Sequence, residues 1–119
     1  MAQHNQLGAI GEQLAVDFLI KKGYVIKERN WRFKKAEVDI IAQTKDILVA
    51  IEVKTRSSDV FGDPQEFIKE KQKKMLVIAI DEYVVSRDLD LEVRFDVIGI
   101  IKNDSQTVIE HLEDAFFHF

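Results

Sequence analysis

Apolar residues spaced three and four positions apart predict a helix near the start of the chain, from Gln6 to Lys22. Asn5 precedes this run as the expected N-cap, and Gly23 follows it as the expected left-handed residue after the helix. Glu12 falls at the edge of the apolar stripe, where its carboxylate can lean over the end of a sheet. The stripe consists of Leu7, Ile10, Leu14, Phe18 and Leu19.

Short runs rich in β-branched and aromatic residues predict strands after this helix. The first is YVIKERNWRF (24–33). Ile40–Ala42 and Ile47–Val53 flank a short polar segment, so we expect these two strands to pair as a hairpin. LEVRFDVIGII (91–101) is a further strand, and QTVIEHL (106–112) is a short strand or an extension.

A loop-like stretch, TRSSDVFGDP (55–64), precedes a second predicted helix. Asp63 suits its N-cap and Pro64 its first helical position. The resulting order is α-β-β-β-α-β with one further strand-like piece, which predicts an α/β domain spanning residues 1–119, with helices packed on a central mixed sheet. The residues expected on the buried face of the second helix are Phe67, Ile68, Met75, Leu76, Ala79 and Tyr83.

The composition suits one globular domain, because 46% of the 119 residues are hydrophobic and 32% are charged. The absence of cysteine excludes disulfides and thiolate metal sites, and it suits a reducing cytoplasm, where we expect the protein. The first residues lack the pattern of a signal peptide, and no apolar run approaches the ~18 residues of a membrane span. We therefore expect no association with a membrane.

The net charge of −4 argues against a protein that coats DNA without specificity. The charge is unevenly distributed along the chain, however. Residues 27–74 contain 12 Lys/Arg and 9 Asp/Glu, a balance of +3, whereas the remaining residues carry −7. The middle of the chain is thus the part best able to meet a phosphate backbone.

Carboxylates interrupt the two central apolar runs. Side chains two positions apart share a face of a strand, so Glu37 lies with Asp39 and Glu52 with Lys54. A hairpin brings Asp39 and Glu52 near the same end, where a cation would relieve their repulsion, and oxygen ligands favour Mg²⁺ or Mn²⁺. Such an ion can activate water and neutralise a scissile phosphate, while Lys54 stabilises the transition state. Taken alone, Glu-x-Lys is more often a solvated ion pair worth under ~1 kcal/mol, and only the combination with the other carboxylates favours a metal site.

Asp39, followed by Glu52-Val53-Lys54, resembles the PD-(D/E)xK motif of restriction-endonuclease-like nucleases, and the arrangement looks like that of archaeal Holliday-junction resolvases. The whole chain resembles the small bacterial YraN family of predicted endonucleases. The similar segments are GAIGEQLAVDFLIKKGYVIKERNWR, AEVDIIA, LVAIEVKTRSSDVFGDP, KQKKM, RFDVIGI and HLEDAF. Val38 stands where the motif's name has proline, and Ala36 where we expect the family's glycine.

This resemblance implies a restriction-endonuclease-like fold and a role for each matching residue. Asp39 and Glu52 would be ligands of Mg²⁺ or Mn²⁺, with the backbone carbonyl of Val53 as a third ligand. Lys54 would be the catalytic lysine, and Glu12 an accessory acid that binds metal or water. The implied activity is metal-dependent hydrolysis of DNA, with branched and single-stranded forms as candidate substrates.

Contacts to nucleic acid are expected from two segments. Thr55 and Arg56 directly follow the motif, where they can meet a phosphate. Lys69, Gln72 and Lys73 form a polar face on the second helix, which can follow a phosphate backbone. Acidic residues in the same stretch make an ordinary solvated helix face an equal alternative.

Several other residues have two interpretations. Trp31 can stack on an unpaired base or pack in the core, and we favour packing. Asp96 can lie near the metal or pair with Arg94, and His111 is expected in packing or at the surface and not as a base. The aromatic segment AFFHF (115–119) either folds onto the core or mediates self-association. A homodimer would suit a junction resolvase, because two symmetric cuts need two active sites.

Three functions are therefore open. The leading one is a Mg²⁺- or Mn²⁺-dependent endonuclease that acts on DNA. The second is a nucleic-acid-binding or adaptor protein with this fold and weak or no catalysis, which the net charge of −4 favours because an acidic surface repels DNA. The third, less favoured, is a protein-binding module that uses the aromatic tail.

Overall fold

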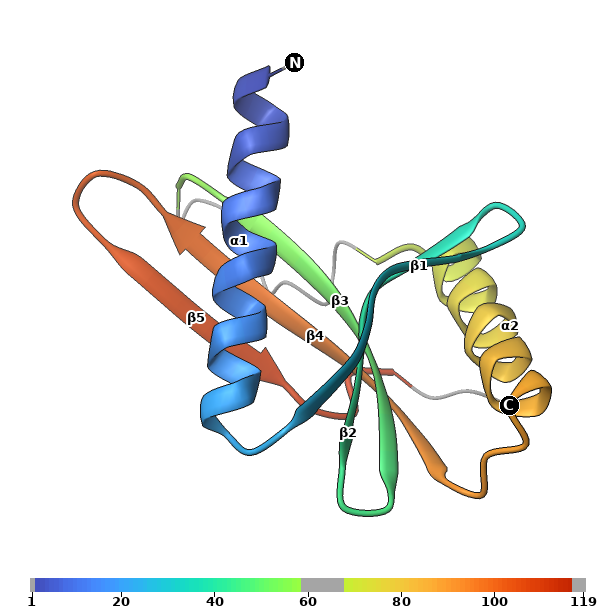
Figure 1. Ribbon diagram of the computed structural model, residues 1–119. Coiled ribbons are helices and arrows are strands. Elements are labelled where there is room, and N and C mark those ends of the chain that lie inside the picture. Colours follow the sequence, from blue (N-terminus) through green and yellow to red (C-terminus); the bar gives the residue numbers. More distant parts are fainter. Residues whose placement is uncertain (1, 59–67, 117–119) are drawn as a thin grey trace.

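The computed structural model describes residues 2–58 and 68–116, apart from the side chains of residues 2–5. Five strands form one mixed sheet in the order β1-β2-β3-β4-β5, with β3 and β4 parallel and the other neighbours antiparallel. The expected α/β class is confirmed, and the segment TVIEHL forms a strand of its own (Figure 1). The elements are α1 (Ala2–Lys21), β1 (Val25–Phe33), β2 (Ala36–Thr44), β3 (Ile47–Arg56), α2 (Glu70–Ser86), β4 (Glu92–Lys102) and β5 (Thr107–Leu112).

Helix α1 begins earlier than its apolar pattern suggests. Asn5 lies inside the helix, so its expected role as N-cap is wrong. The C-terminal end agrees with the prediction: Gly23 has a φ of 92°, and the Tyr24 amide donates to the Leu19 carbonyl. The buried face is also narrower than expected, because Ile10 is 46% exposed while small residues such as Gly11 and Ala15 meet the sheet.

Helix α2 begins later than its sequence suggests. Lys69 is its N-cap and has an extended backbone, with φ −74° and ψ 156°. Ile68 is buried in the core but lies outside the helix, so the expectation of one continuous helix from Asp63 is wrong at residues 68 and 69. Asp63, Pro64 and Phe67 lie outside the described residues. Leu76, Ala79 and Tyr83 are buried on the helix as expected.

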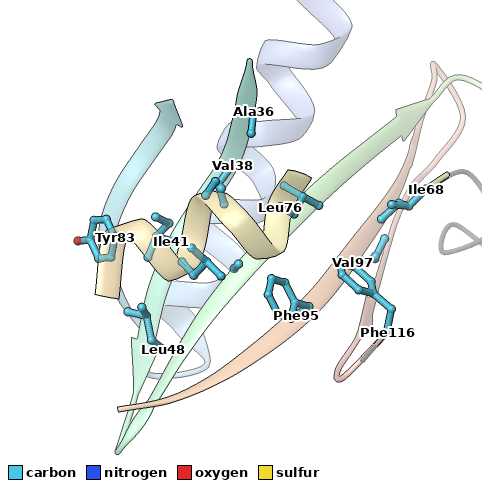
Figure 2. Close-up of a cluster of buried hydrophobic side chains, with 13 residues drawn as sticks. Ala36, Val38, Ile41, Leu48, Ile68, Leu76, Tyr83, Phe95, Val97 and Phe116 are labelled. Carbon is cyan, nitrogen blue, oxygen red and sulfur yellow. The ribbon is translucent and has the colours of Figure 1, made fainter. Parts of the chain in front are cut away.

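The two helices cover opposite faces of the sheet, which explains the continuous apolar run of β3. On one face, Tyr83 and Leu76 of α2 lie with Ile41, Leu48 and Phe95 of the sheet (Figure 2). On the other face, α1 packs through a second cluster of buried side chains. That cluster comprises Ala15, Val16, Leu19, Tyr24, Ile40, Ala42, Val49, Ile51, Ile98 and Ile100.

Strands β2 and β3 separate partway along their length. Their pairing runs from Thr44–Ile47 to Ile40–Ile51 and then stops. Beyond this point β2 stays with β1, whereas β3 continues beside β4 as far as Arg56 (Figure 1). This divergence, which we call the strand fork, places Asp39 and Glu52 on its two arms. In the described residues no helix is both long and apolar enough to cross a membrane.

Candidate metal and nucleic-acid site at the strand fork

Asp39 bridges the strand fork. Its Oδ2 accepts a 2.8 Å hydrogen bond from the backbone N–H of Val53 on β3. The carboxylate therefore takes the place of the backbone acceptor that β2 no longer supplies at this position. This hydrogen bond fixes the position of one carboxylate oxygen of Asp39 relative to the backbone of β3.

Glu52 is buried on the other arm of the strand fork, with 7% of its surface exposed. Its Oε2 accepts a hydrogen bond from Nε2 of Gln72 on α2, while its buried Oε1 has no hydrogen-bond partner. Burial, and then the facing carboxylate of Asp39, raise the pKa of Glu52 to about 9. A buried oxygen without a partner beside a second carboxylate is an environment that a cation would stabilise.

Lys54 lies beside this pair, as the alternation of side chains along a strand predicts. Its Nζ is 4.0 Å from Glu52 Oε2, and its side chain is partly exposed. The ammonium group partly offsets the effect of burial on the pKa of Glu52. A positively charged hydrogen-bond donor therefore lies between the buried carboxylate and solvent.

Glu12 reaches the same region from α1. It lines a cavity of about 370 Å³ together with Asp39, Lys54, Thr55 and Arg56. Its Oε1 accepts a 2.8 Å hydrogen bond from Asn30 and lies 3.5 Å from Nη2 of Arg29. Glu12 is therefore anchored by β1 residues that the sequence did not single out. Asn30 has a left-handed backbone, with φ 53°, and this conformation leaves no sequence signal because asparagine tolerates it.

The predicted nucleic-acid contacts divide into separate groups. Thr55 and Arg56 line the cavity of the carboxylates, whereas Lys69 and Gln72 line a neighbouring cavity between β2 and α2. Lys73 instead lies 3.1 Å from Glu70 and over the ring of Phe116. The contact of Gln72 with Glu52 was not anticipated, because residues twenty positions apart meet here only through the placement of α2.

The second acidic position, Glu37, also borders the carboxylate cavity. Its Oε2 lies 3.3 Å from Nε of Arg32 on β1, in an exposed ion pair. Trp31 packs edge-on against Tyr83, with ring centroids 5.2 Å apart, which agrees with the packing interpretation. Burial is the main cause of the raised pKa of Glu52, and the negative charge of Glu37 also contributes, as the last of several causes.

Asp96 and His111 form a separate buried cluster. Arg94 donates two hydrogen bonds of 2.9 Å to Asp96, and the Asp114 amide donates another. Nε2 of His111 lies 2.7 Å from Asp96, and Nδ1 lies 2.9 Å from the Lys22 ammonium. Because an ammonium can only donate, Nδ1 is the acceptor and Nε2–H donates to Asp96. Of the two interpretations of Asp96, pairing with Arg94 is therefore the one observed.

The donor set fits a hard cation with few protein ligands. Among the side chains that the structure describes, no three His, Cys, Asp or Glu are grouped as metal ligands. Mg²⁺, however, is commonly held by one or two carboxylates and completed by water and substrate phosphate. Asp39 and Glu52 supply such a pair, and the unpartnered Glu52 Oε1 is directly suited to it.

Comparisons with known proteins agree with the resemblance found in the sequence. Residues 11–100 match the sequence model described as "Uncharacterised protein family UPF0102". UPF0102 proteins of Flavobacterium psychrophilum and Christiangramia forsetii are 60% and 57% identical, and each match covers all of both chains. A UPF0102 protein of Bacteroides fragilis is 43% identical over 98% of this chain and 97% of its own. The chain therefore belongs to the UPF0102 family, also called the YraN family.

Proposed function

We propose that the protein is a Mg²⁺- or Mn²⁺-dependent endonuclease that hydrolyses phosphodiester bonds in DNA. The observation that supports this most strongly is the carboxylate pair at the strand fork. A core alone would not place a buried glutamate, with one oxygen unpartnered, beside a second carboxylate and a lysine. These are the residue types that hydrolysis of a phosphodiester requires.

Each residue at the strand fork has a distinct part in this mechanism. Asp39 and Glu52 would hold the cation, and a bound cation would supply the means to activate water and to offset charge on the phosphate. Lys54 orients the attacking water or stabilises the charge that develops on phosphate oxygens. Glu12 is the accessory acid that lines the same cavity from α1, and Gln72 holds Glu52 in position through its amide.

The substrate would approach the site over the residues at the end of β3. Thr55 and Arg56 border the cavity, where a scissile phosphate would enter. The backbone carbonyl of Val53 remains our proposed third metal ligand. If the substrate is a four-way junction, a homodimer would supply the second active site for the opposing cut.

Cleavage of a labelled DNA panel tests this proposal. Linear duplex, single strand, flap and four-way junction are incubated with the protein in Mg²⁺, in Mn²⁺ and in EDTA. Glu52→Gln is expected to abolish cleavage, whereas Glu110→Gln, the same exchange at an exposed position on β5, should leave it unchanged. Circular dichroism verifies that both variants are folded. Equal cleavage by wild type and Glu52→Gln would contradict the assignment.

The second candidate is a nucleic-acid-binding or adaptor protein without turnover. Its support is the net charge of −4, since an acidic surface disfavours DNA away from the strand fork. DNA binding that persists in EDTA, with no cleavage of any substrate in either metal, would favour this function over the nuclease. Light scattering with and without a four-way junction would measure the oligomeric state.

A further inference from the structure

An apolar pocket opens between the β1–β2 hairpin and α2. It encloses about 290 Å³ and is lined by Phe33, Lys34, Lys35, Ala36, Met75 and Ile78. Ile78 is 57% exposed, although it lies on the helix that covers this face of the sheet. The hairpin turn is held by Lys34, whose left-handed backbone has a φ of 56°. Apolar side chains thus form the floor, and two lysines stand at the turn.

This pocket adjoins a second cavity of about 360 Å³, with which it shares Lys35, Ala36 and Met75. The second cavity leads toward the strand fork, because Glu37 borders both it and the carboxylate cavity. Gln72 also lines it while donating to Glu52. A chain lying in the carboxylate site can therefore continue along α2 into the apolar pocket.

The charge along this path is positive, although the whole chain is acidic. Lys35, Lys69 and Lys71 line the second cavity, and all three are exposed. Among the described residues that line it, the carboxylate is that of Glu37, which pairs with Arg32. Lysines beside an apolar floor match a nucleic-acid strand with unstacked bases, because the phosphates require cations and each base face requires an apolar surface. A duplex hides its base faces by stacking and cannot fill such a pocket.

We propose that the apolar pocket between the β1–β2 hairpin and α2 binds an unpaired nucleotide of the nucleic-acid strand that is cut at the strand fork. The base lies against Phe33, Met75 and Ile78. The phosphates that link it to the scissile position lie beside Lys35 and Lys69. This inference rests on the proposed function for its nucleic-acid substrate, and it makes single-stranded character beside the scissile bond the feature that is recognised.

Binding in EDTA tests the pocket without requiring catalysis. Fluorescence anisotropy measures the affinity of the full chain for a labelled oligothymidine strand, its RNA counterpart and a blunt duplex. Ile78→Glu is expected to weaken single-strand binding about tenfold, because it places a carboxylate where a base would lie. Val85→Glu is the matched control, since it adds the same charge to α2 at a residue that is 67% exposed, and it should change the affinity by less than about twofold.

A second measurement does not depend on a variant. A single strand carrying one photoreactive thymine analogue is irradiated with the protein, and the modified peptide is sequenced. Crosslinks at Phe33, Met75 or Ile78 support the proposal, whereas crosslinks confined to other surfaces overturn it. The relative affinities of the DNA and RNA strands decide which sugar the pocket accepts.

The outcomes separate this inference from the proposed nuclease. Equal loss of affinity in Ile78→Glu and Val85→Glu, or equal binding of strand and duplex, would overturn the pocket even if DNA is cleaved. Selective loss in Ile78→Glu together with the crosslinks would support the pocket even if no DNA is cleaved in Mg²⁺ or Mn²⁺. In that case the nuclease proposal alone would fail.

Discussion

The backbone N–H of Val53 donates a 2.8 Å hydrogen bond to Oδ2 of Asp39 across the strand fork. Ile40, the residue that follows Asp39, is the last residue at this end of β2 that pairs with β3. The Asp39 side chain therefore satisfies a β3 amide at the position where the two strands separate. One residue serves both the fold and the proposed metal site, and substitutions can separate these two roles.

Asp39→Ala should destabilise the protein by about 1–3 kcal/mol, because it leaves a part-buried N–H of Val53 without an acceptor. Asp39→Asn keeps an oxygen acceptor and should retain most of that stability while losing metal binding. Urea denaturation in EDTA measures both variants against wild type. Equal stability of the two variants would show that the hydrogen bond has no role in holding the strand fork.

Glu52→Gln should abolish stabilisation by Mg²⁺. A ligand that binds only the folded state raises its melting temperature, and the amide removes one of the two proposed carboxylate ligands. In EDTA this variant should be at least as stable as wild type, because burial disfavours the carboxylate and the amide carries no charge. Thermal unfolding with and without Mg²⁺ measures this, with Glu110→Gln as the control. A rise in melting temperature equal to that of wild type would remove Glu52 from the ligand set.

Asp96 should make the protein sensitive to acid. Burial alone would raise the pKa of its carboxyl, but hydrogen bonds from His111, Arg94 and the Asp114 amide outweigh burial and lower it below the usual 3.8. The folded state then binds fewer protons than the unfolded state. This stabilisation is complete above pH 3.8 and is lost as the pH falls through the folded pKa.

Replacing Asp96 by Asn should flatten this loss of stability in acid while destabilising the protein near neutral pH. Removing one partner of a buried charge pair costs about 3–5 kcal/mol, and Arg94 would keep its 3.6 Å ion pair with Glu113 but lose the one with Asp96. Urea denaturation between about pH 6 and pH 2 measures the slope, and Asp81→Asn on the exposed face of α2 is the control. An unchanged acid slope would place the sensitivity in other carboxyl groups.

Gly11 allows α1 to approach the end of β3. A Cβ at this position would overlap the side chain of Thr55, whose own Cβ would be 2.8 Å away. Gly11→Ala should therefore destabilise the protein by about 1–3 kcal/mol and displace the helix that carries Glu12. Gly8→Ala, one turn earlier, meets nothing within 4 Å and should be neutral or stabilising by up to about 1 kcal/mol. Thermal unfolding of both variants distinguishes close packing from helix propensity.

Local patterns in the sequence account for much of the fold. The β2–β3 hairpin, the buried face of α2 and the turn at Gly23 each depend on neighbours within a few residues, and all three agree with the prediction. The errors lie at the helix starts, where Asn5 is inside α1 and α2 begins only after Lys69, its N-cap. Capping residues are weak signals of a helix start, because tertiary packing can extend a helix beyond its cap. It can also hold the residues before a helix in a buried, non-helical conformation, as at Ile68.

Alternation along paired strands is a local rule, and it is enough to predict that Asp39, Glu52 and Lys54 lie near one end of a hairpin. The packing of the whole domain sets where β2 and β3 separate, brings Gln72 of α2 to Glu52, and brings Asn30 to Glu12. These contacts join residues that are 18 or 20 positions apart. They depend on how far the twisted strands diverge and where each helix packs, and no local pattern of side chains specifies those two quantities.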